Sequence, residues 1–175
     1  MNTSTATPPS APPAVQQLLD EANPKGMQNY WTADFLTGLP DEVIDMLVEH
    51  ATKPVSPLSQ VIVLAGGGAI ARVDEDATAF GQRSAPWNAH LLSIWPDPAD
   101  NERNISYTRA IATALKPWTT GRAYLNFIGH EGLGRVEVAF GAERFSRLRE
   151  LKTRWDPKNF FRHNQNIPPN PAEPA

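Results

Sequence analysis

The chain contains no cysteine, and this absence excludes several kinds of site. Without thiols there is no disulfide framework, no thiolate metal centre and no cysteine nucleophile. The sequence also lacks an apolar run long enough to cross a membrane, and its N-terminus lacks the basic and apolar segments of a signal peptide. We therefore expect a cytoplasmic protein with no membrane partner.

An excess of positive charge is missing as well. The chain has 16 Lys and Arg against 19 Asp and Glu, which gives a formal net charge of -3. Nucleic acids and anionic surfaces recruit basic proteins, so this balance argues against nucleic acid as the main partner.

Metal ligands in a recognisable pattern are also absent. The pair His130-Glu131 resembles the start of a zinc-protease helix, but Gly134 stands where the second histidine would be. The histidines show no ligand-like spacing, so we expect no metal site and interpret each as a surface or packing residue. They are His50, His90, His130 and His163.

What is present suits one globular domain. The 175 residues are 41% hydrophobic and 20% charged, values that are typical of soluble proteins. Residues 1–14 are small, polar and rich in proline, and they are predicted to form a disordered leader. Residues 170–175 are predicted to form a disordered tail, so the globular region is expected between Val15 and Pro169.

Hydrophobic periodicity predicts strands and helices in mixed order. Strands are expected at residues 28–36, 60–65, 69–73, 90–95 and 123–128. Helices are expected at residues 15–20, 41–50, 104–116 and 143–154, the last with Phe145, Leu148 and Leu151 facing inward. This order favours an α+β fold, a partial antiparallel sheet covered on one side by helices.

The three consecutive glycines at residues 66–68 allow two interpretations. A phosphate-binding loop would need the Lys-Ser/Thr of a P-loop or the spacing of a dinucleotide fingerprint, and both are missing. A hairpin turn with positive φ, joining strands 60–65 and 69–73, is the favoured reading.

Tyr124 and Asn126 are the most suggestive polar residues. On a strand, residues two apart point to the same face, so the phenol and the amide are expected side by side, with Leu125 and Phe127 facing the helices. A phenol can act as a general base, and an amide can hydrogen-bond a carbonyl. A strand tyrosine is also commonly a packing residue with its hydroxyl satisfied.

The C-terminal string KTRWDPKNFFRHNQNIPP, residues 152–169, resembles the closing signature of the berberine-bridge-enzyme-like FAD-linked oxidases. Further similar segments follow one another along the chain in the same order as in that family. They are VQQLLD (15–20), NYW (29–31), SPLS (56–59), GGAIARV (67–73), TAFGQR (78–83), YLNF (124–127) and RLRELK (147–152).

In that family a vanillyl-alcohol-oxidase-type FAD domain is followed by a substrate domain with an antiparallel sheet backed by helices. The resemblance implies that residues 15–150 are a partial substrate domain and that residues 151–169 are the berberine-like C-terminal segment. It also implies roles for three residues. Tyr124 would be the catalytic base, and Asn126 and Asn164 would contact the flavin.

Several features of the family have no counterpart here. The glycine-rich pyrophosphate loop, the histidine and cysteine that tether FAD, and the first strands of the substrate sheet are absent from the sequence. Phe127 lacks the hydroxyl of a second tyrosine that many relatives have, and Trp155 replaces the usual tyrosine. The resemblance therefore implies that this chain alone does not bind FAD tightly.

Two functions follow from the resemblance. In the first, the chain is the substrate-domain part of an FAD-dependent oxidoreductase that oxidises a C–H-bearing alcohol or amine by hydride transfer to flavin. It would be inactive without a separate FAD-binding polypeptide, which is its expected partner. In the second, it is a non-catalytic interaction module or a truncated remnant. In either case a half sheet favours a homo-oligomer.

Overall fold

The computed structural model describes residue 17 and residues 20–129 and 131–171. The predicted leader and His130 lie outside these residues, as do most of the predicted helix at 15–20 and of the predicted tail. Among the described residues, no helix is long and apolar enough to cross a membrane.

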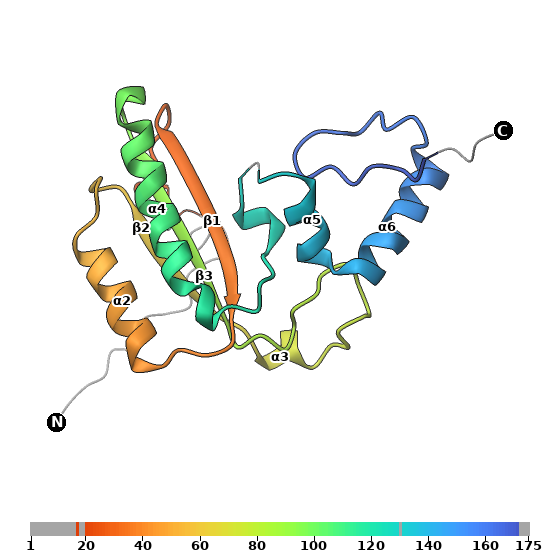
Figure 1. The fold of residues 1–175 in the computed structure, drawn as a ribbon, viewed down its shortest axis with the longest axis horizontal. Coiled ribbons are helices and arrows are strands. Elements are labelled where there is room, and N and C mark those ends of the chain that lie inside the picture. The colour runs from red at the N-terminus through yellow and green to blue at the C-terminus, as the bar shows by residue number, and fades with distance from the viewer. Residues whose placement is uncertain (1–16, 18–19, 130, 172–175) are drawn as a thin grey trace.

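A three-stranded antiparallel sheet forms the first lobe of the molecule (Figure 1). Its strands are β1 (Gln28–Leu36), β2 (Gln60–Ala65) and β3 (Trp87–Trp95), in the order β1-β3-β2. Since both outer strands are antiparallel to β3, they run parallel to each other in a split β-α-β arrangement. The strands expected at 28–36 and 60–65 are confirmed, and the one expected at 90–95 begins earlier.

Helices α2 (Asp41–Thr52) and α4 (Asn101–Leu115) cover one face of this sheet (Figure 1). Between them and the sheet lies a core cluster of aliphatic side chains that includes Leu36, Leu91 and Ile111. This arrangement confirms the predicted α+β fold with helices on one side. Helix α2 begins after a proline and carries acids in its first turn, which suits the positive end of the helix dipole.

The segment from residue 118 to residue 129 runs along the outer edge of β1. Phe35 N–H donates to the Arg122 carbonyl at 3.0 Å, and Gly129 N–H donates to the Trp31 carbonyl at 3.3 Å. The strand expected at 123–128 is wrong, because a 3-10 helix, η3 (Leu125–Phe127), interrupts it. This turn lets the apolar side chains of the segment pack in one cluster against Ala33, which strict alternation would prevent.

The expected glycine hairpin is also wrong, because β2 pairs with β3 and the glycines lead into a short helix, α3 (Gly68–Ala71). Gly67 and Gly68 do have positive φ, at 109° and 54°. Gly66 is required for a different reason. Its N–H donates to the Pro86 carbonyl at 2.7 Å, and a Cβ there would lie 2.3 Å from the Ala85 carbonyl oxygen.

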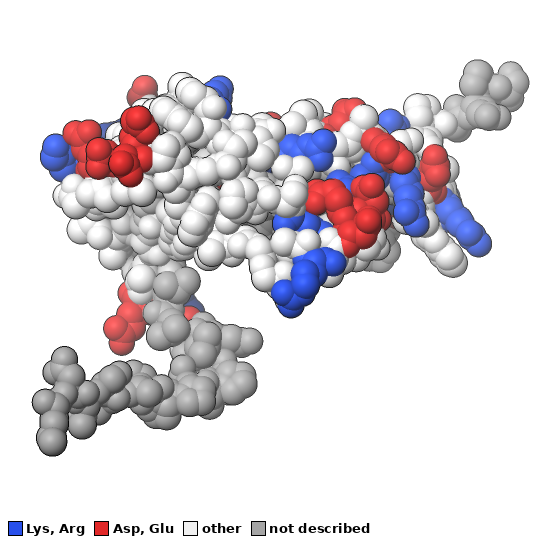
Figure 2. Space-filling model, turned by 90° about the horizontal axis from the view of Figure 1, so that it is seen from below, with Lys and Arg blue, Asp and Glu red and all other residues white. Residues whose placement is uncertain are grey.

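The second lobe contains α5 (Leu133–Phe140), which was not predicted, and α6 (Ala142–Trp155), which was. On the face that Figure 2 shows, charged side chains gather at both ends of the molecule, and the surface between them is largely uncharged. Phe145 is buried as expected. The prediction that Leu151 faces inward is wrong, because its side chain is 47% exposed.

Replacement of Gly66 tests the close approach of β2 to the loop before β3. Gly66→Ala should lower the free energy of unfolding by about 1–3 kcal/mol, because the added methyl group meets backbone that cannot move aside. Urea denaturation measures this change. Gly38→Ala is the matched control, since no atom lies within 4 Å of the position of its Cβ. Equal effects of the two substitutions would contradict this account of Gly66.

Candidate functional site

Tyr124 and Asn126 lie side by side at η3. Tyr124 has extended backbone just before the turn, and the Asn126 Nδ2 donates a hydrogen bond to the Tyr124 hydroxyl oxygen at 2.8 Å. The phenol and the amide therefore lie side by side as expected, but a 3-10 turn brings them together instead of a strand. The orientation expected for Phe127 is wrong, because Phe127 packs on the sheet face away from α2 and α4.

Aromatic rings hold the Tyr124 side chain in place. The Tyr124 ring makes edge-to-face contacts with Phe80 at 5.5 Å and with Phe127 at 4.9 Å between centroids. Phe80 in turn contacts Phe35 of β1 at 6.4 Å. Contacts of this geometry are favourable and fix the orientation of each ring, so the phenol is held in a defined direction.

The loop that carries Phe80 is held by two charged side chains. The Glu75 carboxylate accepts a hydrogen bond from Arg83 N–H at 2.9 Å, and Arg144 of α6 donates to the Glu75 carbonyl at 2.7 Å. A Cβ at Gly81 would lie 2.4 Å from a guanidinium nitrogen of Arg144. Helix α6 therefore helps to hold the loop that carries Phe80 in place.

Residues 156–170 form what we call the C-terminal strap, which extends from the end of α6 toward α5 and returns (Figure 1). Asp156 accepts hydrogen bonds from the N–H groups of Phe160 and Phe161 at 2.7 and 3.0 Å. The hydrogen bond from Lys152 and these N–H donors hold the pKa of Asp156 below its ordinary value. Arg149 donates to the carbonyls of residues 168 and 169 and fixes the far end of the strap.

The middle of the strap is joined to the segment that contains Tyr124. The Gln165 side-chain amide donates to the carbonyls of Ile128 and Gly129 at 3.2 and 3.0 Å. This contact brings Asn164 next to η3, although the two are distant in sequence. Asn164 has a positive φ of 58°, a conformation that asparagine tolerates better than most residues.

Two cavities lie on either side of this junction. One, of about 470 Å³, is lined by Tyr124, Asn126, Asn164 and His163. The other, of about 740 Å³, is also lined by Asn126 and Asn164. The structure thus places the three predicted site residues around one cavity. The described part of the chain has no group of three or more His, Asp or Glu side chains that could hold a metal ion.

Asn88 and His90 of β3 were not identified from the sequence as site residues. Both lie on the sheet face away from α2 and α4, and the His90 ring stacks flat on Phe127 at 4.4 Å. Burial lowers the pKa of His90. Alternation along a strand shows that the two share a face, but it does not show which segment covers that face, so the sequence carried no signal for this site.

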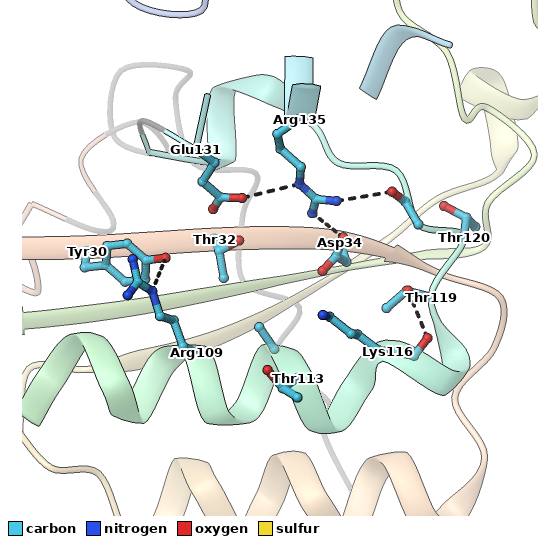
Figure 3. Close-up of a pocket in the computed structure, with 12 residues that line it drawn as sticks. Tyr30, Thr32, Asp34, Arg109, Thr113, Lys116, Thr119, Thr120, Glu131 and Arg135 are labelled. Carbon is cyan, nitrogen blue, oxygen red and sulfur yellow. Dashed lines mark hydrogen bonds and ion pairs between the residues drawn. The ribbon is translucent and has the colours of Figure 1, made fainter. Parts of the chain in front are cut away.

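A further cavity, of about 1000 Å³, lies on the helix-covered side of β1 (Figure 3). Several of its charged groups make hydrogen bonds or ion pairs with neighbouring side chains. Arg135 contacts Asp34 at 2.5 Å and Glu131 at 3.3 Å, and Arg109 donates to the Tyr30 hydroxyl at 3.3 Å. Burial raises the pKa of Asp34, and the Arg135 guanidinium opposes that rise. None of the three predicted site residues lines this cavity, so we interpret its ion pairs as a clasp between β1 and α5.

The family model described as "Berberine and berberine like" matches residues 123–168. The matched region begins one residue before Tyr124 and ends within the C-terminal strap. It therefore covers Tyr124, Asn126 and Asn164.

Curated relatives include proteins named as FAD-linked oxidoreductases. The chain is 28% identical to the uncharacterized FAD-linked oxidoreductase YvdP of Bacillus subtilis, over 79% of this chain and 30% of that protein. It is 34% identical to YgaK of the same organism, over 72% of this chain and 27% of that protein. It is 27% identical to the tetrahydroberberine oxidase of Berberis wilsoniae, over 89% of this chain and 33% of that protein. The chain thus spans about a third of the length of these relatives.

Solved structures show that the fold is shared. BBE-like #28 from Arabidopsis thaliana superposes with a TM-score of 0.74 at 20% identity, over 84% of this chain and 35% of that one. The grass pollen allergen Phl p 4, described with glucose dehydrogenase activity, superposes with a TM-score of 0.73 at 21% identity, over 90% and 36% of the two chains. Taken together, residues 123–168 match a berberine-like domain, and most of the chain is similar to proteins named as FAD-linked oxidoreductases and to berberine-bridge-enzyme-like structures.

Proposed function

We propose that the chain is the substrate-domain part of an FAD-dependent oxidoreductase that oxidises an alcohol or amine at a C–H bond, and that a separate polypeptide supplies the FAD-binding domain. The observation that carries this proposal is the hydrogen bond between Asn126 and the Tyr124 hydroxyl at the edge of a cavity that Asn164 also lines. About two thirds of each of these relatives has no counterpart in this chain.

The side chains around Tyr124 fit one part of FAD and not the other. The amides of Asn126, Asn164 and Gln165 line both cavities, and amides can pair with the alternating donors and acceptors at the edge of a flavin ring. Among the described residues that line these cavities, none is Lys or Arg. A pyrophosphate needs such cations, a backbone nest or a helix N-terminus, so its binding site is expected on the partner.

Tyr124 is the residue proposed to move a proton. Its oxygen would accept the proton of the substrate hydroxyl or amine while the C–H bond is broken. The bound flavin would supply the hydride acceptor. The Asn126 amide holds the phenolic oxygen at 2.8 Å, and the edge-to-face contacts with Phe80 and Phe127 fix the ring. Preorganisation of this kind reduces the reorganisation required when the substrate binds.

The separate FAD partner can be tested by the colour of the purified protein. The chain is purified alone and after co-expression with an FAD-domain polypeptide encoded beside it, and visible flavin absorbance is recorded after gel filtration. We expect absorbance only in the co-purified complex, because the phosphate-binding elements lie on the partner. Colourless protein in both preparations would contradict the proposal. Yellow protein from the chain alone would show that it holds FAD by itself.

The role of Tyr124 can be tested by Tyr124→Phe in that complex. The rate of flavin reduction by substrate should fall roughly 100- to 10,000-fold, the usual contribution of general base catalysis. The phenyl ring retains the packing against Phe80, so the melting temperature should change little. Tyr107→Phe is the matched control, because the Tyr107 hydroxyl donates to the His50 carbonyl on the helix side. A normal rate in Tyr124→Phe would remove this residue from the mechanism.

A further inference from the structure

The floor of the large cavity in Figure 3 is polar, although it lies on the sheet face that helices cover. Residues two apart on a strand share a face, and Tyr30, Thr32 and Asp34 of β1 form this floor. Thr32 is only 5% exposed, and burial raises the pKa of Asp34. Leu36, the next residue on the same face, belongs to the aliphatic core. The apolar packing of the sheet therefore stops before Asp34, and a cavity of about 1000 Å³ takes its place.

Helix α4 supplies one wall of this cavity. Arg109, Thr113 and Lys116 are spaced four and three residues apart, so they lie along one side of the helix. Two turns, or about 10 Å along the helix axis, separate the two cations. Both side chains are long enough to contact one small ligand bound between them. In Figure 3 the Lys116 side chain extends across the cavity toward Arg109.

A third cation already pairs with the carboxylates of the cavity. Arg135 contacts both Asp34 and Glu131, and it donates to the Gly121 carbonyl at 3.1 Å. The charged residues that line the cavity are therefore three cations, Arg135 with Arg109 and Lys116, and two carboxylates. The two cations of α4 leave an excess of positive charge there.

These two cations retain donors that no described residue accepts. Arg109 donates through Nε to the Tyr30 hydroxyl at 3.3 Å, and its guanidinium lies over the Tyr30 ring at 5.3 Å. Its terminal nitrogens have no partner in the described part of the chain, and neither has the Lys116 ammonium. Lys116 acts on Asp34 through its charge alone, which opposes the rise in the pKa of that carboxyl. Unused cationic donors around one cavity favour an anion.

We propose that this cavity binds the terminal phosphate of a small phosphate monoester, with Arg109 and Lys116 on opposite sides of the phosphoryl group. A guanidinium pairs with two oxygens of such a group, and an ammonium can bind the third. The hydroxyls of Thr32 and Thr113 also line the cavity and can donate to the same oxygens. Together these donors outnumber the roughly four lone-pair sites of a carboxylate, so a phosphate is the better match.

The phosphate site does not depend on the proposed oxidoreductase function. None of Tyr124, Asn126 and Asn164 lines this cavity. Both phosphates of FAD are bridged on two sides, so neither offers the three free oxygens and the double charge of a terminal phosphate. The expected ligand is therefore a separate small molecule and not the flavin cofactor.

The test titrates glycerol 3-phosphate into the 175-residue chain without FAD and measures binding by calorimetry. Ionic strength is held constant, because salt screens weak attraction between exposed charges. We expect saturable binding at one site and competition by inorganic phosphate. Glycerol and acetate should compete about tenfold less well or worse, since glycerol lacks the charge and acetate lacks the third oxygen. FAD at the same concentration should not compete.

Lys116→Met removes one cation and keeps the length of the side chain. We expect glycerol 3-phosphate to bind about tenfold or more weakly, the effect of one charge-assisted hydrogen bond. The melting temperature should change little, because Lys116 is exposed and its ammonium has no partner among the described residues. Lys53→Met is the matched control. It changes the net charge of the chain equally, but Lys53 lies after α2 and does not line the cavity, so the affinity should stay unchanged.

Arg109→Lys separates a shaped site from a general positive patch. The substitution keeps the charge and removes the planar guanidinium, so a site that uses two parallel hydrogen bonds should lose about tenfold in affinity. Attraction by charge alone predicts an unchanged affinity, and that result would contradict the proposed geometry. Circular dichroism of the variant checks that the fold is retained.

Four further outcomes would overturn the proposal. They are no saturable binding by the wild-type chain, equal losses in Lys116→Met and Lys53→Met, acetate binding as tight as that of phosphate, and competition by FAD. The titration needs neither flavin nor turnover, so its result and that of the colour test are independent. Phosphate binding by a chain that never yields a coloured complex would keep this site and remove the oxidase. A coloured complex without phosphate binding would do the reverse.

Discussion

The outer edge of β1 is the constraint on which the rest of the structure depends. An unpaired strand edge exposes backbone donors and acceptors that must be satisfied, and here the segment from residue 118 to residue 129 satisfies several of them. The same segment then turns through η3 and so places Tyr124 against Asn126. Its last carbonyls, at Ile128 and Gly129, receive Gln165 from the C-terminal strap. One run of backbone pairing thus joins the two lobes and assembles the candidate site.

The two faces of the sheet serve different purposes. The face under α2 and α4 is packed with aliphatic side chains, and the buried hydroxyls of Ser93 and Thr108 hydrogen-bond there at 2.6 Å. The opposite face is covered by aromatic rings from loops, and it retains the unpaired amide of Asn88. The aliphatic core therefore lies on one face, and aromatic rings beside cavities lie on the other. This division is typical of a site supported by a rigid scaffold.

Sequence patterns located the regular elements well and the irregular ones poorly. The strand at 28–36 and the helices α2 and α4 have clear periodicity bounded by proline, and the structure confirms them. The segments at 69–73 and 123–128 were predicted as strands because their composition suits β structure. Neither segment forms a strand, because contacts with distant parts of the chain determine the backbone conformation there. Gly66 must approach the Ala85 carbonyl, and η3 must turn its apolar side chains onto Ala33.

By itself, the sequence indicated the resemblance to the berberine-like proteins, the α+β class and the pairing of a phenol with an amide two residues apart. These depend on residue order and local spacing, which a linear reading can follow. Only the tertiary structure decided that Asn164 returns to that pair, that Phe80 packs on Tyr124, and that Asn88 is buried without a partner. These features arise from contacts between segments distant in the chain. Their formation depends on which loop covers which face of the sheet, and local propensity carries no information about that choice.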